Sequence, residues 1–227
     1  MEMRKGIEYS QKSWNPFTGC KGIADGTCAV GKNCWAYKMS LRQAGRNGYD
    51  KNNPFRPTLH ENRLNQPTIR GKPTIYNVSF MGDIAYANFE QLYRITDICN
   101  KTQRHRYIFL TKRPDLLVKS EIMFPDNCIV GITVNRKEDL WRIERLKEIK
   151  CKYRWVSFEP IYGEIEPDLE GIDWCVVGAQ TNPDYQPELH WSLKVIDAAD
   201  KLEIPVFLKP NLKRFVGRYE VPEMLKI

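Results

Sequence analysis

The sequence is poor in the residues that build common zinc sites. It has only three histidines, and none of its cysteines are separated by two residues. Structural zinc sites usually combine two close Cys or Cys/His pairs, a pattern that is missing here. The chain also lacks an apolar run long enough to span a membrane, and its beginning, MEMRKGIEY, lacks the apolar stretch of a secretory signal. We therefore expect a cytoplasmic protein without a membrane segment.

Length, composition and charge limit the number of domains and the kinds of partner to expect. The chain has 227 residues, 42% of them hydrophobic, and its 35 Lys and Arg against 28 acids give a net charge of +7. A chain of this length can bury one substantial core, so we expect residues 1–227 to form a single domain. The positive charge favours an anionic partner, but charge alone makes nucleic acid only one candidate.

Three cysteines dominate the loop at 14–39, which is rich in Gly, Asn and Lys. Cys20, Cys28 and Cys34 are spaced Cys-x7-Cys-x5-Cys, and the other four cysteines occur singly. Three thiolates that leave one iron open to a small ligand predict an iron–sulfur cluster. Zinc remains an alternative, as does a disulfide, although a disulfide needs an oxidising compartment.

Residues 7–72 precede the regular alternation of strands and helices, and they predict a strand, a loop, a helix and a long irregular excursion. Residues 7–13 predict a first strand, and Trp14-Asn15-Pro16 then breaks the backbone into the cysteine loop. Residues 34–44 predict a helix opened by Cys34, where free N–H groups stabilise a thiolate. The polar stretch at 46–72 predicts a long excursion with at most one short helix, which we interpret as a lid or substrate loop.

From Pro73 onward, apolar runs alternate with amphipathic helical periods. The predicted strands are residues 74–80, 106–111, 128–134, 154–158, 174–178 and 205–208. The helical periods are marked by Phe89, Leu92, Thr96 and Cys99; by Leu140, Ile143, Leu146 and Ile149; and by Leu193, Ile196, Ala199 and Leu202. Strands that alternate with helices indicate parallel strands joined by right-handed crossovers. Six or seven such units predict an α/β fold, a partial TIM barrel of mostly parallel strands.

Each predicted strand leads into polar residues. The first strand leads into the three cysteines, and the next into Ser79, Gly82 and Asp83. The others lead into Lys112-Arg113, Thr133 and Asn135, Glu159, Gln180, and Lys209 with Asn211. Loops are usually wet, which explains any single case, but active sites of parallel barrels form where strands end. The sequence therefore predicts one polar rim that also holds the cysteines.

These segments carry a family resemblance. WNPFTGC, CWAYKMS, PTLHENRLNQP, SFMGDI, FLTKRPD, VSFEPIYGEI and WCVVGAQT, in this order, resemble the phage- and prophage-associated three-cysteine-motif family. That family is related to radical S-adenosylmethionine (radical SAM) enzymes and is distantly similar to the spore photoproduct lyase group. The resemblance implies a radical SAM-like partial (βα)6 barrel, a [4Fe–4S] cluster on Cys20, Cys28 and Cys34, and S-adenosylmethionine on the open iron.

The resemblance also implies residue roles. Ser79, Gly82 and Asp83 would meet the methionine amine, and Thr133 and Asn135 would reach the ribose hydroxyls. Lys112 or Arg113 would hold the carboxylate or a substrate anion, and Glu159 would be a substrate or ribose ligand. Lys112 and Glu159 are the candidates for catalysis. A salt bridge to a rim cation is the structural alternative for Glu159.

The cysteine spacing departs from the usual Cys-x3-Cys-x2-Cys of radical SAM enzymes. An aromatic residue often precedes the last cysteine in that pattern, but Asn33 stands there in this chain. Trp35 and Tyr37 follow the cysteine instead, so they become the candidates to lie near the nucleoside. Both could equally be core residues, because aromatic side chains fill cores elsewhere.

The substrate is not identified by these residues. Basic clusters occur at 101–106, 136–145 and 209–218, and the last, LKPNLKRFVGRY, mixes cations with Phe215 and Tyr219 in the manner of a nucleic-acid contact. In residues 136–149 the interleaved acids predict a solvated salt-bridge face instead. Two functions remain open: a radical SAM-type enzyme with an external electron donor, or a non-catalytic nucleic-acid-binding protein with a zinc or structural cysteine site.

Overall fold

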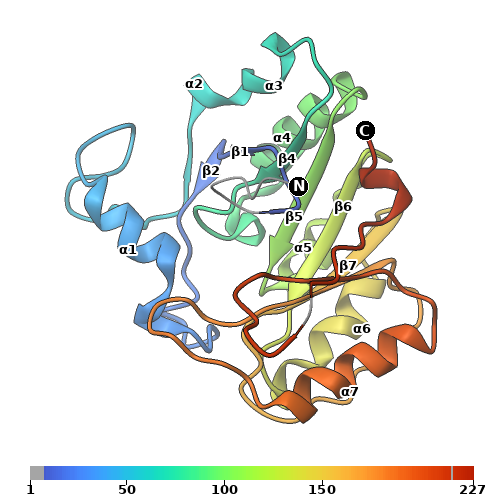
Figure 1. Cartoon of the computed structure of the whole chain (residues 1–227). Helices are drawn as coiled ribbons and strands as arrows, with labels where there is room; N and C mark the ends of the chain where they lie inside the picture. The colour runs from blue at the N-terminus through green and yellow to red at the C-terminus, as the bar shows by residue number, and fades with distance from the viewer. Residues whose placement is uncertain (1–7, 216) are drawn as a thin grey trace.

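The computed structural model describes residues 8–215 and 217–227 and has an α/β fold built on a seven-stranded sheet. All strands are parallel and lie in chain order, and the sheet curls into a half-barrel like part of a TIM barrel (Figure 1). The strands are β1 (Lys12–Trp14), β4 (Ile75–Val78), β5 (Arg106–Thr111), β6 (Cys128–Thr133), β7 (Tyr153–Phe158), β8 (Trp174–Val177) and β9 (Val206–Leu208). The predicted partial barrel is confirmed, with seven strands rather than six.

Most strand predictions are confirmed to within two residues, and β5 has the predicted bounds at both ends. The first strand is the exception, because β1 begins at Lys12 and includes Trp14. Residues 1–7, where this strand was predicted to begin, lie outside the described residues. Trp14 is fully buried, and its backbone pairs with Val78 of β4, so the break caused by Pro16 follows one residue after the strand ends.

Helices cover the outer face of the sheet (Figure 1). They are α4 (Phe89–Lys101), α5 (Pro114–Ser120), α6 (Trp141–Lys147) and α7 (Leu189–Asp200), with 3-10 turns η2 (Ile84–Tyr86) and η3 (Lys137–Asp139) before α4 and α6. The start of α4 is fixed by a capping box between Asn88 and Gln91. Between β7 and β8 the chain forms no helix over 159–173, so this crossover is irregular. Figure 1 and the strand order therefore describe an incomplete βα repeat.

The predicted helix faces are partly wrong. Phe89, Leu193 and Leu202 are exposed, although each was predicted to face the core. The other predicted members of these two faces, Leu92, Thr96, Cys99, Ile196 and Ala199, are buried, and Ile95 and Val195 are buried beside them. The buried face of each helix is therefore the predicted one, widened by a neighbouring position and without those three residues.

Alternating strand residues build two cores. Side chains such as Val130, Val156 and Val177 face the helices, and they form the larger apolar cluster. The opposite, concave face carries Ile108, Trp155, Trp174 and Phe207, which pack with Tyr9 and Leu225 from near the two ends of the chain. The 3-10 turn η4 (Glu223–Leu225) belongs to this cover. The amino half of the barrel interior is thus filled by aromatic side chains.

The segment between β1 and β4 stands apart from this repeat. It contains a small antiparallel pair, β2 (Phe17–Thr18) and β3 (Thr58–Leu59), the turn η1 (Gly31–Asn33) and the helices α1 (Trp35–Arg42), α2 (Glu61–Leu64) and α3 (Gln66–Ile69). The excursion therefore has two short helices rather than at most one. Figure 1 shows α1 at the side of the molecule, away from α4–α7. In the described residues, no helix has the length and apolar character needed to cross a bilayer.

Candidate active site at the carboxyl end of the sheet

The cysteine loop is joined to the carboxyl end of β4 by two glycines. Gly19 donates its N–H to the Met81 carbonyl at 3.1 Å, and Asp83 donates to the Gly19 carbonyl at 3.0 Å. A Cβ at Gly82 would lie 2.2 Å from the Gly19 oxygen, so only glycine permits this approach. This contact places Cys20 beside the strand end, as the motifs WNPFTGC and SFMGD predict.

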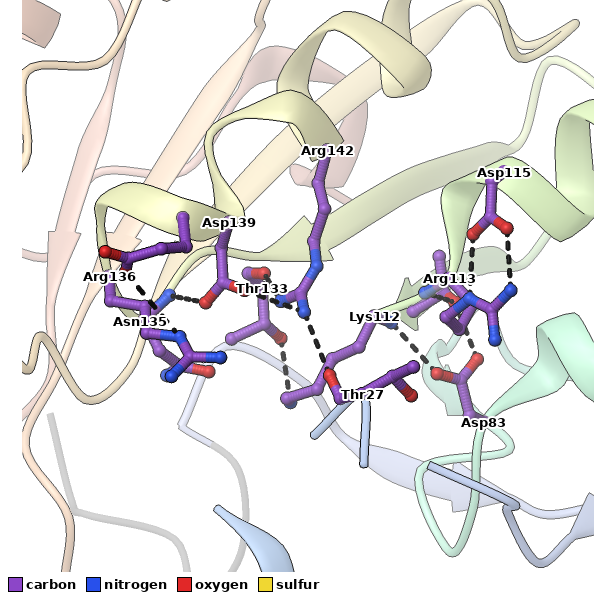
Figure 2. A network of polar contacts seen from close by, with 12 residues as sticks. Thr27, Asp83, Lys112, Arg113, Asp115, Thr133, Asn135, Arg136, Asp139 and Arg142 are labelled. Carbon is purple, nitrogen blue, oxygen red and sulfur yellow. Dashed lines mark hydrogen bonds and ion pairs between the residues drawn. The ribbon is translucent and has the colours of Figure 1, made fainter. Parts of the chain in front are cut away.

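A buried arginine holds the middle of the same loop (Figure 2). The Arg142 guanidinium donates to the Thr133 carbonyl at 2.7 Å and to the Thr27 carbonyl at 3.2 Å, and it pairs with Asp139 at 2.8 Å. Both charged side chains are only 3% exposed. Burial lowers the pKa of Arg142, and the charge of Asp139 opposes this shift. The prediction of a solvated face is therefore wrong at Arg142, because the residue reaches inward to the loop.

The three cysteines are free, half-buried and held by one stretch of backbone. The Gly22 N–H donates to Cys20 Sγ at 3.2 Å, and a Cβ at Gly22 would touch both Cys20 and Cys28. The pKa of Cys20 is raised to about 12, mainly by burial and also by the nearby charges of Asp83, Cys28 and Cys34, while the hydrogen bond from the Gly22 N–H opposes the shift. Cys34 is the N-cap residue of α1, which confirms that the third cysteine opens a helix.

The three thiols share one loop but form no closed ligand set in the described residues. Within residues 8–215 and 217–227, no group of three or more His, Cys, Asp or Glu side chains could hold a metal ion. His60 instead hydrogen-bonds Thr18 Oγ1 at 2.7 Å. The chemistry of the donors still fits an iron–sulfur cluster, since three thiols and a sulfur-directed N–H share one anchored loop.

Asp83 joins three segments at the head of the site. Its carboxylate accepts from Thr111 Oγ1 at 2.6 Å, from the Lys112 N–H at 2.9 Å and from the Ala85 N–H at 3.1 Å. These bonds tie the end of β4 to the end of β5 and cap η2. The carboxylate is buried and fully engaged, so its structural work is to fix the turn that carries Gly82.

Lys112, Thr133 and Asn135 continue the network across the next strands (Figure 2). Lys112 Nζ donates to Thr133 Oγ1 at 3.2 Å. The Asn135 side chain donates to the carbonyls of Glu159 and Pro160 at 2.9 and 2.8 Å. The structure therefore brings these three predicted residues together, and it links the end of β6 to the end of β7.

Two buried oxygen atoms at this edge have no partner in the described structure. Ser79 has φ +58°, a left-handed conformation that is uncommon outside glycine, and its Oγ makes no hydrogen bond. Asn135 Oδ1 is likewise buried and unpaired. Buried polar atoms nearly always have partners, so both are candidates to meet a ligand.

The two aromatic candidates occupy different environments. Trp35 lies on the first turn of α1 and is 55% exposed. Tyr37 packs edge-on against Phe55, with ring centroids 5.5 Å apart. Tyr37 is thus half-buried in a ring contact outside the two core clusters, whereas Trp35 presents its ring to solvent.

Glu159 forms the ion pair that was its structural alternative. Its Oε1 lies 2.7 Å from Lys209 Nζ, and a Cβ at Gly178 would overlap both side chains. Burial alone lowers the pKa of Lys209, but Glu159 and Tyr9 outweigh it and the pKa is raised. Lys209 was predicted only as a member of the polar rim, without a role, and Tyr9 was not predicted. Lys209 follows a strand, a signal that was visible, whereas the role of Tyr9 depends on the tertiary fold.

Comparison with known families matches residues 4–218 to a family described as a protein of unknown function, DUF5131. The chain belongs to this family. The match spans the cysteine loop, every strand of the sheet and the polar edge. No curated protein and no solved structure matches the chain.

In this DUF5131 member a cleft opens beside the cysteine loop. Its volume is about 580 Å³, within the range of about 300–1,000 Å³ that ligand pockets occupy. Its walls come from the cysteine loop, the loop after β6 and the loop after β7, and the lining residues are Ala29, Arg136, Lys137, Glu138, Tyr162, Gly163 and Glu164. A ligand here would lie next to Cys28 and at the strand ends.

The basic C-terminal segment is internally paired. Lys213 contacts Asp184 at 2.6 Å, and Arg214 lies 3.8 Å from Glu188. Arg218 contacts both Asp200 and Glu220 at 2.8 Å. Three of these acids precede the segment by eight or more residues and Glu220 directly follows it, so the apparent lack of acids in LKPNLKRFVGRY does not extend to three dimensions. Phe215 packs against the core, and only Tyr219 of the two aromatics is exposed.

Proposed function

We propose that this protein is a radical SAM-type iron–sulfur enzyme, as the resemblance to the three-cysteine-motif family and to spore photoproduct lyase implies. The observation that carries the proposal is the placement of three free thiols on one loop at the carboxyl end of a parallel half-barrel. Gly82 and Arg142 fasten that loop to the ends of β4 and β6. Active sites of (βα) barrels lie at this end of the strands.

Cys20, Cys28 and Cys34 hold a [4Fe–4S] cluster in this proposal, and S-adenosylmethionine is the second cofactor. With one electron from an external donor, the bound pair would break a sulfonium C–S bond to give methionine and a 5′-deoxyadenosyl radical that takes a hydrogen atom from the substrate. The loop is fastened at Gly19, by Gly82, and at Thr27, by Arg142, and the backbone between these two points contains Gly22 and Gly26. Because glycine backbone is conformationally free, this part of the loop could move to bring the three thiols together.

The remaining residues bind and orient. Ser79 Oγ and Asn135 Oδ1 offer unpaired oxygens to the amine and ribose of S-adenosylmethionine, while Asp83 fixes the turn at Gly82. Thr133 orients the ammonium group of Lys112, which holds a carboxylate or substrate anion. Trp35 and Tyr37 both follow the last cysteine, and Tyr37, which packs edge-on against Phe55, is the ring that would lie near the nucleoside.

Glu159 is proposed to contact the substrate, with Lys209 as its positioning residue. The ion pair fixes the direction of the carboxylate beside Gly178. Because the pair lies at the ends of β7 and β9, it stands across the rim from Cys20 and Asp83. The substrate would then lie between the cysteine loop and Glu159.

The test is anaerobic reconstitution followed by quantification of iron, sulfide and zinc, and of 5′-deoxyadenosine formed under reducing conditions. We expect about four irons per chain for the natural protein, and a large loss of iron and of product for Cys34→Ser. Cys151→Ser is the matched control, because Cys151 is also a half-buried free thiol but lies outside the loop. Stoichiometric zinc without iron would overturn the proposal and favour the binding-protein alternative.

A further inference from the structure

The segment around α1 is basic and contains no acid at all. Between Asp25 and Asp50 the sequence has Lys32, Lys38, Arg42 and Arg46 and neither Asp nor Glu. Within the described part of the chain, none of these four cations forms an ion pair. The cations of the C-terminal segment are paired, so the two basic regions differ in the charge that they leave for a partner.

Helical spacing gathers these cations beside an exposed aromatic ring. Trp35, Lys38 and Arg42 follow one another at steps of three and four residues, which places them on one face of α1. Trp35 is 55% exposed, and Arg42 is exposed with only a 3.5 Å contact to Met39 Sδ. An aromatic ring flanked by unpaired cations is the combination that binds the bases and phosphates of a single strand.

A groove of different chemistry borders this face. Its volume is about 380 Å³, and α1 contributes Met39, while the residue after the helix, Gln43, also lines it. Its remaining lining residues are Asn47, Tyr49, Asn62, Arg63, Gln66 and Met81. Of the eight lining residues, four have amide side chains: Gln43, Asn47, Asn62 and Gln66. The one charged side chain, Arg63, donates to the carbonyls of Asn15 and Asn47.

The amide side chains of the groove have free hydrogen-bonding capacity. Asn47 donates to Gln43 at 2.9 Å, which leaves the Gln43 NH₂ available. Asn62 and Gln66 are exposed, and their side chains have no partner among residues 8–215 and 217–227. Asn and Gln pair with base edges because one side chain both donates and accepts. The groove is therefore suited to an uncharged, flat group with hydrogen-bonding edges, such as a nucleobase.

We propose that α1 and this groove bind single-stranded nucleic acid. Lys38, Arg42 and Arg46 contact phosphates, Trp35 stacks on a base, and an unstacked base enters the amide-lined groove. The face adjoins the cysteine loop directly, since Cys34 caps α1. If the bound strand is the substrate, the inference rests on the proposed function. Binding of the strand by itself does not require the iron–sulfur cluster.

The test is fluorescence anisotropy of a labelled DNA or RNA strand of roughly 12 nucleotides, with the full-length protein before and after iron reconstitution. We expect binding in both states. Lys38→Gln with Arg42→Gln should weaken it at least about ten-fold and reduce the slope of log affinity against log salt by about 1.4, since each phosphate contact contributes about 0.7 for single strands. Trp35→Ala should weaken binding about ten-fold by loss of stacking.

The matched control is Lys213→Gln with Arg214→Gln, which removes the same charge from the paired C-terminal segment. We expect it to change affinity less than two-fold. Equal losses in the two double variants would overturn the proposal, because they would show a response to net charge alone. Binding to phosphatidylserine vesicles but not to oligonucleotides would overturn it as well, and would assign the face to a membrane surface.

The groove has its own variant. Asn62→Leu with Gln66→Leu keeps the charge of α1, so we expect the salt slope to stay and the difference among adenine, thymine, cytosine and guanine homopolymers to shrink. An unchanged base preference would remove the groove from the proposal. Loss of 5′-deoxyadenosine with intact oligonucleotide binding would count against the proposed function only, whereas product formation without any oligonucleotide binding would overturn this inference only.

Discussion

The C-terminal segment and α1 are both rich in cations, but only one of them has charge to offer. Lys213, Arg214 and Arg218 each pair with acids from elsewhere in the fold. Lys38 and Arg42 have no such partners in the described residues, and no acid lies nearby in the sequence. A basic stretch therefore identifies a binding surface only when its counter-charges are located in three dimensions. The paired cations serve the fold, and the unpaired ones remain available to a ligand.

The most deeply paired cation should show the largest effect. Arg142→Met leaves Asp139 as a buried unpaired charge and frees the Thr27 carbonyl, so we expect a loss of about 3–5 kcal/mol in the free energy of unfolding. Urea denaturation measures it. The double variant Arg142→Met with Asp139→Asn should recover part of this loss, because no lone charge is buried. A double variant as unstable as the single one would show that the contacts to the cysteine loop, rather than the ion pair, carry the effect.

Lys209 should respond less strongly. Its side chain is 14% exposed and pairs with Glu159, so we expect Lys209→Met to lower the free energy of unfolding by roughly 2 kcal/mol. Lys38→Met on α1 is the comparison, with an expected change within about 0.5 kcal/mol for a surface site. The measurement is thermal or urea unfolding of the two variants side by side. Equal losses in the free energy of unfolding would contradict the distinction between the paired and the unpaired lysine.

The pH dependence of the free energy of unfolding should distinguish the paired C-terminal segment from α1. We expect this effect to be smaller than those of the Arg142 and Lys209 variants. A side-chain hydrogen bond from Arg218 is the main cause that lowers the pKa of the Glu220 carboxyl, and the Val206 N–H also lowers it. Because the folded pKa lies below the unfolded value, this stabilisation is present above the unfolded pKa of about 4.3 and is lost as the pH falls through the folded value.

Arg218→Gln should therefore lower stability near neutral pH and flatten the decline in acid. Urea denaturation at several pH values between neutral and acid is the measurement. Arg42→Gln should leave the shape of the curve unchanged. An acid decline of natural steepness in Arg218→Gln would contradict the assigned pairing.

Much of the fold follows from local patterns in the sequence. Buried runs such as RYIFLT and CIVGIT are apolar on both faces, which is why their bounds could be predicted. Helix α5 could not, because PDLLVKS is one short amphipathic segment beginning at a proline. Phe89 and Leu193 show that a period identifies the buried face of a helix but not how far that face extends toward the start of the helix.

The site was predictable to the extent that it depends on strand order. Cys20, Asp83 and Asn135 lie at the same edge because parallel strands end there, and the sequence indicated where each strand ends. The pairing of Glu159 with Lys209 joins residues 50 positions apart, and no local pattern encodes it. The acid-free stretch around α1 was visible in the sequence, but its significance depends on which cations the fold neutralises.

The central claim is that the three-cysteine loop holds a cluster whose open iron takes S-adenosylmethionine. The direct measurement is an EPR spectrum of the anaerobically reconstituted, dithionite-reduced protein, recorded with and without S-adenosylmethionine. If the three cysteines hold the cluster, we expect a [4Fe–4S] signal that shifts when S-adenosylmethionine is added and that is absent in Cys34→Ser. A protein with bound zinc, or one without a cluster signal after reconstitution, would contradict it.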